Sequence, residues 1–216
     1  MNNKSQIIAS LLESMNELDV WSPIEPKYFG PSTRTLALFG EIEKDPVLLT
    51  ISQLKHLETL NQEEAITLYL NTEGGSLSDA FALYDCIKNL SCPVIIIATG
   101  LCASAGLLIL SAGDYRAATA STIFYYHQPV FTQHSFINSQ KDMQSLNDFY
   151  SYCQNTVDDI LKETTGISQR KWKTNFDAST GYYFDANKAL KLNFIDKIIS
   201  SNKLEFEIDD SEELDG

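Results

Sequence analysis

The segment that most limits the possible folds is residues 94–99, Val-Ile-Ile-Ile-Ala-Thr. These residues are apolar and mostly β-branched, and they do not alternate with polar ones, which is the pattern of a strand buried on both faces. We expect Gly100 to end this strand. The small and aliphatic residues 103–112 then predict a short, tightly packed helix.

Strands and helices are expected to alternate along most of the chain. A helix should begin at Asp45-Pro46, because Asp can cap a helix and Pro is tolerated in its first turn. Phe184 should open a short helix over 184–190. The remaining predicted strands are 35–42, 65–71, 115–118, 123–127 and 194–199, and the remaining predicted helices are 78–87 and a long amphipathic one over 142–161 that ends by Gly166. This order is typical of an α/β domain with crossover connections.

The length of 216 residues is enough for one domain with short extensions. Residues 1–32 predict an N-terminal helix and a linker rich in proline and glycine. Residues 33–203 form the expected core domain. Residues 204–216 carry seven acidic residues and no basic one, which is typical of a solvated tail.

Composition excludes several classes of function. The formal net charge is −13, from 29 acidic against 16 basic residues, which argues against a nucleic-acid-binding surface. The longest apolar stretch, 94–112, is too interrupted to span a membrane, and we expect no secretory leader. The four cysteines form no CxxC pair, so we expect reduced thiols in the cytoplasm, with no metal and no cofactor.

The first candidate for chemistry is Ser104, in the segment Gly-Leu-Cys-Ala-Ser-Ala-Gly that joins the buried strand to its helix. A structural interpretation is that the small residues allow close packing and that Ser104 caps the helix. In the functional interpretation, the Ser104 hydroxyl stands at a helix N-terminus, where backbone N–H groups stabilise negative charge on a bound carbonyl oxygen.

Gly74 and Gly75 directly follow a predicted strand and form the second candidate. Glycine suits a tight turn with positive φ, and this alone explains the pair. The pair also allows a substrate backbone to approach and offers an N–H donor for an oxyanion. Binding of phosphate is disfavoured, because Glu73 precedes the pair and no Lys follows it.

The third candidate is His127, which ends an apolar strand two residues before Pro129. A buried histidine satisfied by a hydrogen bond is the structural interpretation. Coupled to Ser104, the same imidazole would be a general base.

Together the three segments resemble the ClpP family of serine peptidases. The residues that carry the resemblance are LYLNTEGGSLSDAFALYDCI, ATGLCASAGLLILSAG and YYHQP, and the similarity extends from about residue 35 to about residue 199. The resemblance implies an α/β fold of the ClpP/crotonase type, a spiral of ββα units from which the long helix protrudes as a handle.

The resemblance also implies roles for individual residues. Ser104 would be the nucleophile, His127 the base and Asp177 the acid of a triad. Asp185 is the other carboxylate considered for the acid, but it falls where an N-cap is expected. The implied oxyanion donors are the backbone N–H groups of Gly75 and Ala105, and the implied substrate-binding residues are Gly74, Gly75, Ser76 and Pro129.

The resemblance further implies hydrolysis of peptides or unfolded proteins inside a homo-oligomeric chamber. It also implies seven-subunit rings, two of them stacked, and an AAA+ ATPase unfoldase as partner. Two alternatives stay open: a catalytically inactive subunit or scaffold of the same fold, and a crotonase-like acyl-CoA enzyme. The shortage of basic residues for CoA phosphates disfavours the second. A Ser–Lys dyad is a further variant, but no Lys stands in a comparable apolar setting.

Overall fold

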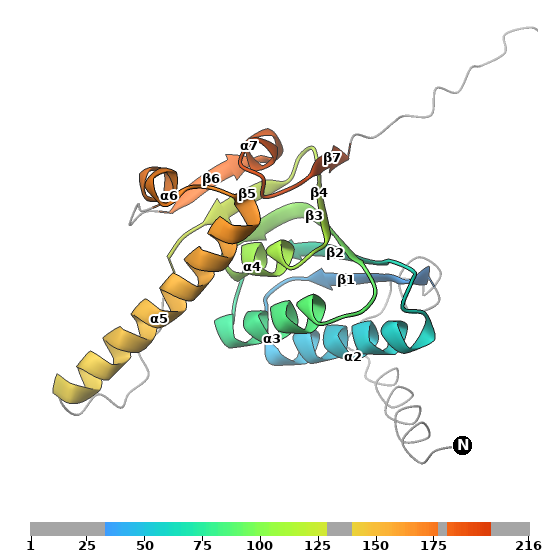
Figure 1. The fold of residues 1–216 in the computed structure, drawn as a ribbon, viewed down its shortest axis with the longest axis horizontal. Coiled ribbons are helices and arrows are strands. Elements are labelled where there is room, and N and C mark those ends of the chain that lie inside the picture. The colour runs from blue at the N-terminus through green and yellow to red at the C-terminus, as the bar shows by residue number, and fades with distance from the viewer. Residues whose placement is uncertain (1–32, 129–139, 177–180, 200–216) are drawn as a thin grey trace, which may run out of the picture.

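The computed structural model of the protein describes residues 33–128, 140–176 and 181–199 (Figure 1). The predicted N-terminal helix and acidic tail lie outside these residues. In chain order the elements are β1 (Thr35–Phe39), α2 (Lys44–Leu60), β2 (Ile66–Thr72), α3 (Leu77–Lys88), β3 (Val94–Ala103), α4 (Ala105–Ser111), β4 (Tyr115–Thr119), β5 (Ile123–Tyr126), α5 (Gln140–Thr165), α6 (Gln169–Phe176), β6 (Tyr182–Asp185), α7 (Ala186–Lys191) and β7 (Lys197–Ile199). The predicted α/β class is confirmed.

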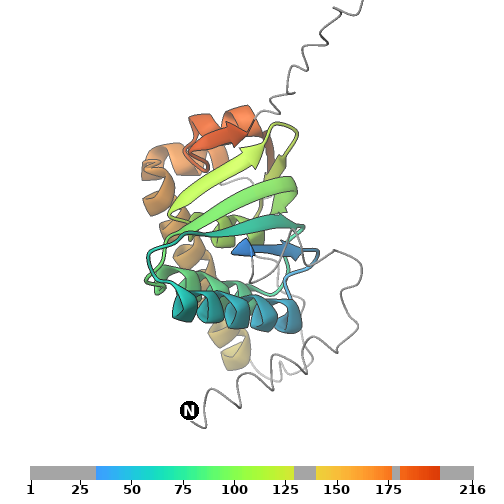
Figure 2. The same ribbon diagram turned by 90° about the vertical axis from the view of Figure 1, so that its right-hand side faces the viewer.

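The described strands form one mostly parallel sheet. The order β1-β2-β3-β4-β7 is parallel throughout, β5 also pairs in parallel with β3, and β6 pairs antiparallel with β5. Helices α2 and α3 pack against each other beside the sheet (Figures 1 and 2), and α3 and α5 both contact α4. The side chains of β2 alternate between buried and half-buried, so one face of that strand contributes fully to the core.

Strand β3 is longer than predicted, because Gly100 does not end it. Its first half pairs with β4 through Ile95 to Ala98, and its second half pairs with β5 through Leu101 to Ala103. At Gly100 φ is +61°, and the register with β2 shifts there. The Asn71 side chain occupies the irregularity and accepts a hydrogen bond from the Leu101 N–H at 3.0 Å. Glycine therefore bends this strand instead of breaking it.

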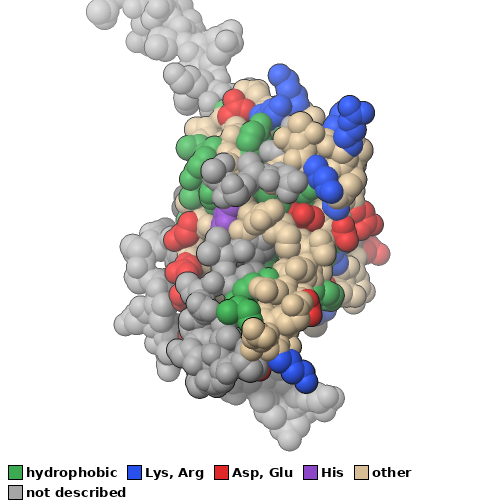
Figure 3. All heavy atoms as spheres, turned by 90° about the vertical axis from the view of Figure 1, so that its left-hand side faces the viewer, with side chains coloured by type: hydrophobic (Ala, Val, Ile, Leu, Met, Phe, Trp, Pro, Cys, Tyr) green, Lys and Arg blue, Asp and Glu red, His purple; other side chains and the backbone are tan. Residues whose placement is uncertain are grey.

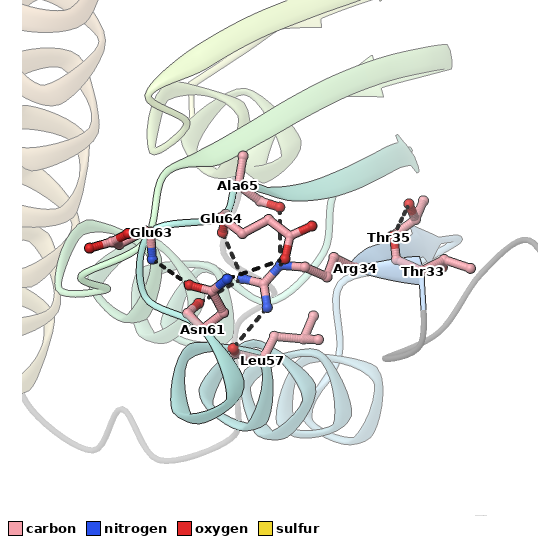
Figure 4. Close-up of polar contacts among 8 residues, drawn as sticks. All are labelled: Thr33, Arg34, Thr35, Leu57, Asn61, Glu63, Glu64 and Ala65. Carbon is pink, nitrogen blue, oxygen red and sulfur yellow. Dashed lines mark hydrogen bonds and ion pairs between the residues drawn. The ribbon is translucent and has the colours of Figure 1, made fainter.

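The start of the sheet is held by Arg34, whose side chain donates hydrogen bonds to four backbone carbonyls (Figure 4). Two of them, Leu57 and Asn61, belong to the end of α2 and its C-cap, and two, Glu64 and Ala65, precede β2. The guanidinium supplies additional donors to carbonyls at the helix end, where the Leu57 carbonyl also accepts the Asn61 N–H. It thereby joins β1, α2 and β2 at one corner.

Two predicted helix starts differ from the structure. The N-cap of α2 is Glu43, which makes no side-chain capping bond, so Asp45 does not cap this helix and lies in its first turn. Phe184 lies in β6 and not in a helix. Asp185 accepts a hydrogen bond from the Lys188 N–H at 2.7 Å and caps α7, which confirms its expected N-cap role.

Helix α5 is the predicted long amphipathic helix, extended at both ends to Gln140–Thr165. Gly166 ends it with φ of +68°, and its N–H bonds to the Lys162 carbonyl at 2.8 Å. The buried residues lie in its C-terminal half, where it packs near α4, while its N-terminal end projects from the body (Figure 1). Met143 and Tyr152 are exposed along the projecting part. This shape agrees with a handle.

Candidate active site

Ser104 occupies the junction between β3 and α4 in a backbone conformation that is rare for a residue with a side chain. Its φ is 54° and its ψ is −123°. A positive φ outside glycine is energetically costly and is concentrated at functional sites. Ser104 holds the N-cap position, but its side chain makes no capping hydrogen bond, so the expected capping role is wrong. The half-buried hydroxyl is therefore left available for another function.

The backbone of Ser104 is tied to the strand that leads to His127. The Ser104 N–H donates to the Tyr125 carbonyl at 2.8 Å, and Ala103 pairs with Tyr125 in the β3–β5 ladder. Since His127 is two residues beyond Tyr125, the fold brings the segments of the predicted nucleophile and base together. This proximity depends on the continuation of β3 past Gly100.

Gly74 lies directly against Ser104. A Cβ atom at Gly74 would stand 2.6 Å from the Ser104 Cβ and 3.1 Å from its Oγ, so no other residue fits without a shift. The Gly74 N–H donates to the buried Thr72 hydroxyl at 3.0 Å, which fixes the turn. Positive φ, at +105°, also favours glycine here. Two of the three predicted segments therefore meet at this contact.

The Gly75 N–H points away from the hydrogen bonds that hold its loop against Ile42. Ile42 bridges the two neighbours of Gly75: its N–H donates to the Gly74 carbonyl at 2.8 Å, and its carbonyl accepts from the Ser76 N–H at 2.7 Å. In such a parallel bridge the central residue directs its own N–H to the other side. Within the described part of the chain, the amides of Gly75 and Ala105 donate to no acceptor.

The other predicted substrate-binding residues are placed as follows. The Ser76 side chain accepts a hydrogen bond from the Asp79 N–H at 3.4 Å and caps α3. Ser76 thus has a structural role in holding the loop. Pro129 lies outside the described residues.

His127 follows the last residue of β5 and is half-buried. Its Nδ1 lies 2.7 Å from the Gln128 carbonyl oxygen. A carbonyl oxygen only accepts, so Nδ1 carries the proton and Nε2 is the acceptor, as a general base requires. The imidazole stacks on the Tyr125 ring with centroids 5.2 Å apart.

Asp177 lies outside the described residues, immediately after α6, so its place beside His127 stays a prediction. Among the described residues no group of His, Cys, Asp or Glu is arranged to hold a metal ion. The space-filling view shows that a histidine side chain reaches the surface on the face carrying the free end of α5, with acidic side chains beside it (Figure 3).

Two functional features escaped the sequence analysis. Asn71 supports the bend of β3 next to the site, and no local pattern of residues indicates this role. Tyr126 was assigned only to a strand, yet its hydroxyl reaches Asp158 on α5. No local pattern indicates such a contact across 32 residues.

The fold and the site define a class: α/β proteins with a serine at a strand-to-helix junction that contacts a glycine turn and bonds through its backbone to the strand that precedes a histidine. The sequence model of the family described as Clp protease matches residues 31–202. Curated proteins of Streptococcus pneumoniae strains P1031 and Hungary19A-6, each named ATP-dependent Clp protease proteolytic subunit, are 31% identical over 173 residues, covering 79% of this chain and 87% of theirs.

The chain belongs to the Clp protease family. The resemblance drawn from the three quoted segments is thereby confirmed. Within the described residues, no helix is both long and apolar enough to cross a membrane.

Proposed function

We propose that this protein is a serine peptidase that cleaves peptide bonds with Ser104, His127 and Asp177. The Ser104 Oγ attacks the carbonyl carbon of the substrate while His127 Nε2 accepts the hydroxyl proton. The imidazolium then gives that proton to the leaving amine, and a water molecule hydrolyses the acyl-enzyme by the same relay. Asp177 accepts a hydrogen bond from Nδ1–H, in place of Gln128, and stabilises the imidazolium.

The observations that carry this proposal are the contact of Gly74 with Ser104 and the two amides that follow these residues in the chain. The N–H groups of Gly75 and Ala105 have no acceptor among the described residues; Gly75 directly follows Gly74, which contacts Ser104, and Ala105 directly follows Ser104 itself. Amides fixed in advance stabilise the oxyanion of the tetrahedral intermediate without reorganising during the reaction. The strained Ser104 backbone supports the same role, because a purely structural serine gains nothing from it.

A fluorophosphonate probe tests the nucleophile directly. We expect wild-type protein to form one covalent adduct, located on Ser104 by peptide mass spectrometry, because the probe traps an activated serine with its oxyanion in the hole. Absence of an adduct together with absence of peptide hydrolysis would favour the inactive-scaffold alternative. Calorimetric titration with CoA would identify the acyl-CoA alternative.

The same proposal includes assembly into a chamber. We propose rings of seven subunits, two of them stacked through α5, and an ATPase unfoldase that delivers substrates. Support comes from the relatives, whose name contains the words ATP-dependent and proteolytic subunit, and from the projecting α5 with Met143 and Tyr152 exposed. Apolar side chains on a projecting helix are typical of an interface.

Charge on the two sides of the projecting part of α5 should weaken this assembly. We expect the variant Met143→Glu/Tyr152→Glu to shift the mass measured by light scattering from a fourteen-subunit particle to seven subunits or fewer, because the contact would bury carboxylates. Leu60→Glu is the matched control, since Leu60 is 61% exposed at the end of α2. An unchanged mass for the α5 variant would contradict this contact.

A further inference from the structure

Tyr126 is a buried tyrosine whose hydroxyl is held by helix α5. Its ring is 2% exposed, and its hydroxyl donates to Asp158 Oδ1 at 2.5 Å. The Gln154 side-chain amide donates both to the Tyr126 oxygen, at 3.0 Å, and to the same Asp158 oxygen, at 2.8 Å. Gln154 and Asp158 are one helical turn apart, so one patch of α5 satisfies the buried hydroxyl.

The Tyr126 ring also contacts α6. It packs edge-on against Trp172, with centroids 5.4 Å apart, and against Phe176, with centroids 5.2 Å apart. Trp172 and Phe176 are both buried. Tyr126 is therefore the point at which β5, α5 and α6 meet, and Phe176 is the residue before Asp177 in the chain.

Tyr126 and His127 lie on opposite faces of the chain. Successive side chains of a strand alternate, and the stack of His127 on Tyr125 confirms that these two share the face opposite to Tyr126. A residue anchored on one face fixes the backbone from which its neighbour extends on the other. The anchor of Tyr126 consequently sets the position of the imidazole.

Packing alone does not account for the hydroxyl. A phenylalanine would make the same ring contacts without the cost of burying a polar group. Burial chiefly, and the hydrogen bond to Asp158 in addition, raise the pKa of Tyr126, so the hydroxyl stays a donor over the whole physiological pH range. The hydrogen bond from Tyr126 to Asp158 fixes the direction of the hydroxyl group, whereas packing of the ring does not.

We propose that Tyr126 and Asp158 are positioning residues for the reaction: their hydrogen bond holds the end of β5 so that His127 Nε2 lies where it accepts the Ser104 proton. This inference rests on the proposed function. Neither residue touches the reacting atoms. Displacement of a catalytic group by about 1 Å reduces a rate by on the order of 100-fold.

Kinetics of three variants test the proposal. Tyr126→Phe removes only the hydroxyl, and Asp158→Leu removes its acceptor. We expect each to lower kcat for a fluorogenic peptide by about 10-fold to 100-fold with KM changed by less than about twofold. Asp158→Asn keeps an oxygen acceptor and should retain most of the wild-type kcat. Tyr84→Phe, a half-buried tyrosine of α3, is the control expected to match wild type.

The double variant separates positioning from stability. Asp158→Leu leaves the buried Tyr126 O–H without its acceptor and should lower Tm, whereas Tyr126→Phe/Asp158→Leu removes both donor and acceptor and should recover it. We expect kcat of the double variant to stay as low as that of either single variant. Recovery of kcat along with Tm would overturn the proposal, as would a wild-type kcat for Tyr126→Phe.

The experiments also distinguish an error in the proposed function from an error in the positioning role. If Ser104→Ala hydrolyses the peptide as fast as wild type, the serine mechanism is wrong, and the positioning role is wrong with it. If Ser104→Ala is inactive and Tyr126→Phe equals wild type, only the positioning role is wrong.

Discussion

Ser104→Ala is expected to abolish peptide hydrolysis. The substitution removes one oxygen atom, the proposed nucleophile, and neither His127 nor the free amides can replace it. The expected loss of kcat is at least about 10⁴-fold, since a serine peptidase without its nucleophile keeps only the residual effect of binding and the oxyanion hole. Steady-state hydrolysis of a short fluorogenic peptide measures this loss.

The same substitution should leave stability almost unchanged, because the Ser104 hydroxyl makes no capping bond. Ser104→Gly should be at least as stable as wild type, since glycine relieves the positive φ, and equally inactive. Ser111→Ala is the matched control. Its hydroxyl donates to the Leu108 carbonyl at 2.7 Å in the same helix, so its loss should affect Tm and not kcat. Activity retained in both Ser104 variants would show that another group reacts.

The elements near the proposed nucleophile could be predicted because their signals are local. The apolar run 94–99 identifies a buried strand, and Asp185 occupies a cap position that the structure confirms. The turn at Gly74 and Gly75 follows from two adjacent glycines, which favour positive φ values. Patterns of this kind depend on the properties of a few neighbouring residues.

The remaining features depend on contacts that are distant in sequence. Gly100 looked like a strand end, but Asn71 from the neighbouring strand supports the bend and lets β3 continue to Ala103. Helix α6 was not predicted, because its polar sequence offers only Trp172 and Phe176 to the core. These two rings are recognisable as core residues only once β5 and β6 are in place beside them.

The candidate site likewise has one part that the sequence pattern predicts and another that depends on distant contacts. Ser104 and Gly74 are brought into contact by adjacent parallel strands, which the α/β pattern predicts. The tautomer of His127 and the anchor of Tyr126 depend on single hydrogen bonds, to Gln128 and Asp158. Sequence patterns carry no information on such bonds, so positioning residues are found only in the structure.

Gly74→Ala should give the second large effect on activity. The added Cβ would meet the Ser104 Cβ at 2.6 Å and the Ala103 carbonyl oxygen at 3.1 Å, both on a rigid junction. Either the nucleophile or the loop that presents the Gly75 N–H must move. Loss of alignment with one oxyanion donor costs about 10²-fold to 10³-fold in kcat. Steady-state kinetics and the rate of fluorophosphonate labelling should fall together.

The variant Gly40→Ala distinguishes the effect of this collision on activity from the effect of backbone strain alone. Gly40 has φ of +92°, close to the +105° of Gly74, but a Cβ there would meet no atom within 4 Å. Both variants should lose about 1–3 kcal/mol of unfolding free energy to backbone strain, measured by urea unfolding, and Gly74→Ala should lose more because of the collision. Only Gly74→Ala should lose activity in the folded fraction. Equal kcat for both variants would mean that Gly74 serves the turn alone and that the contact with Ser104 has no part in catalysis.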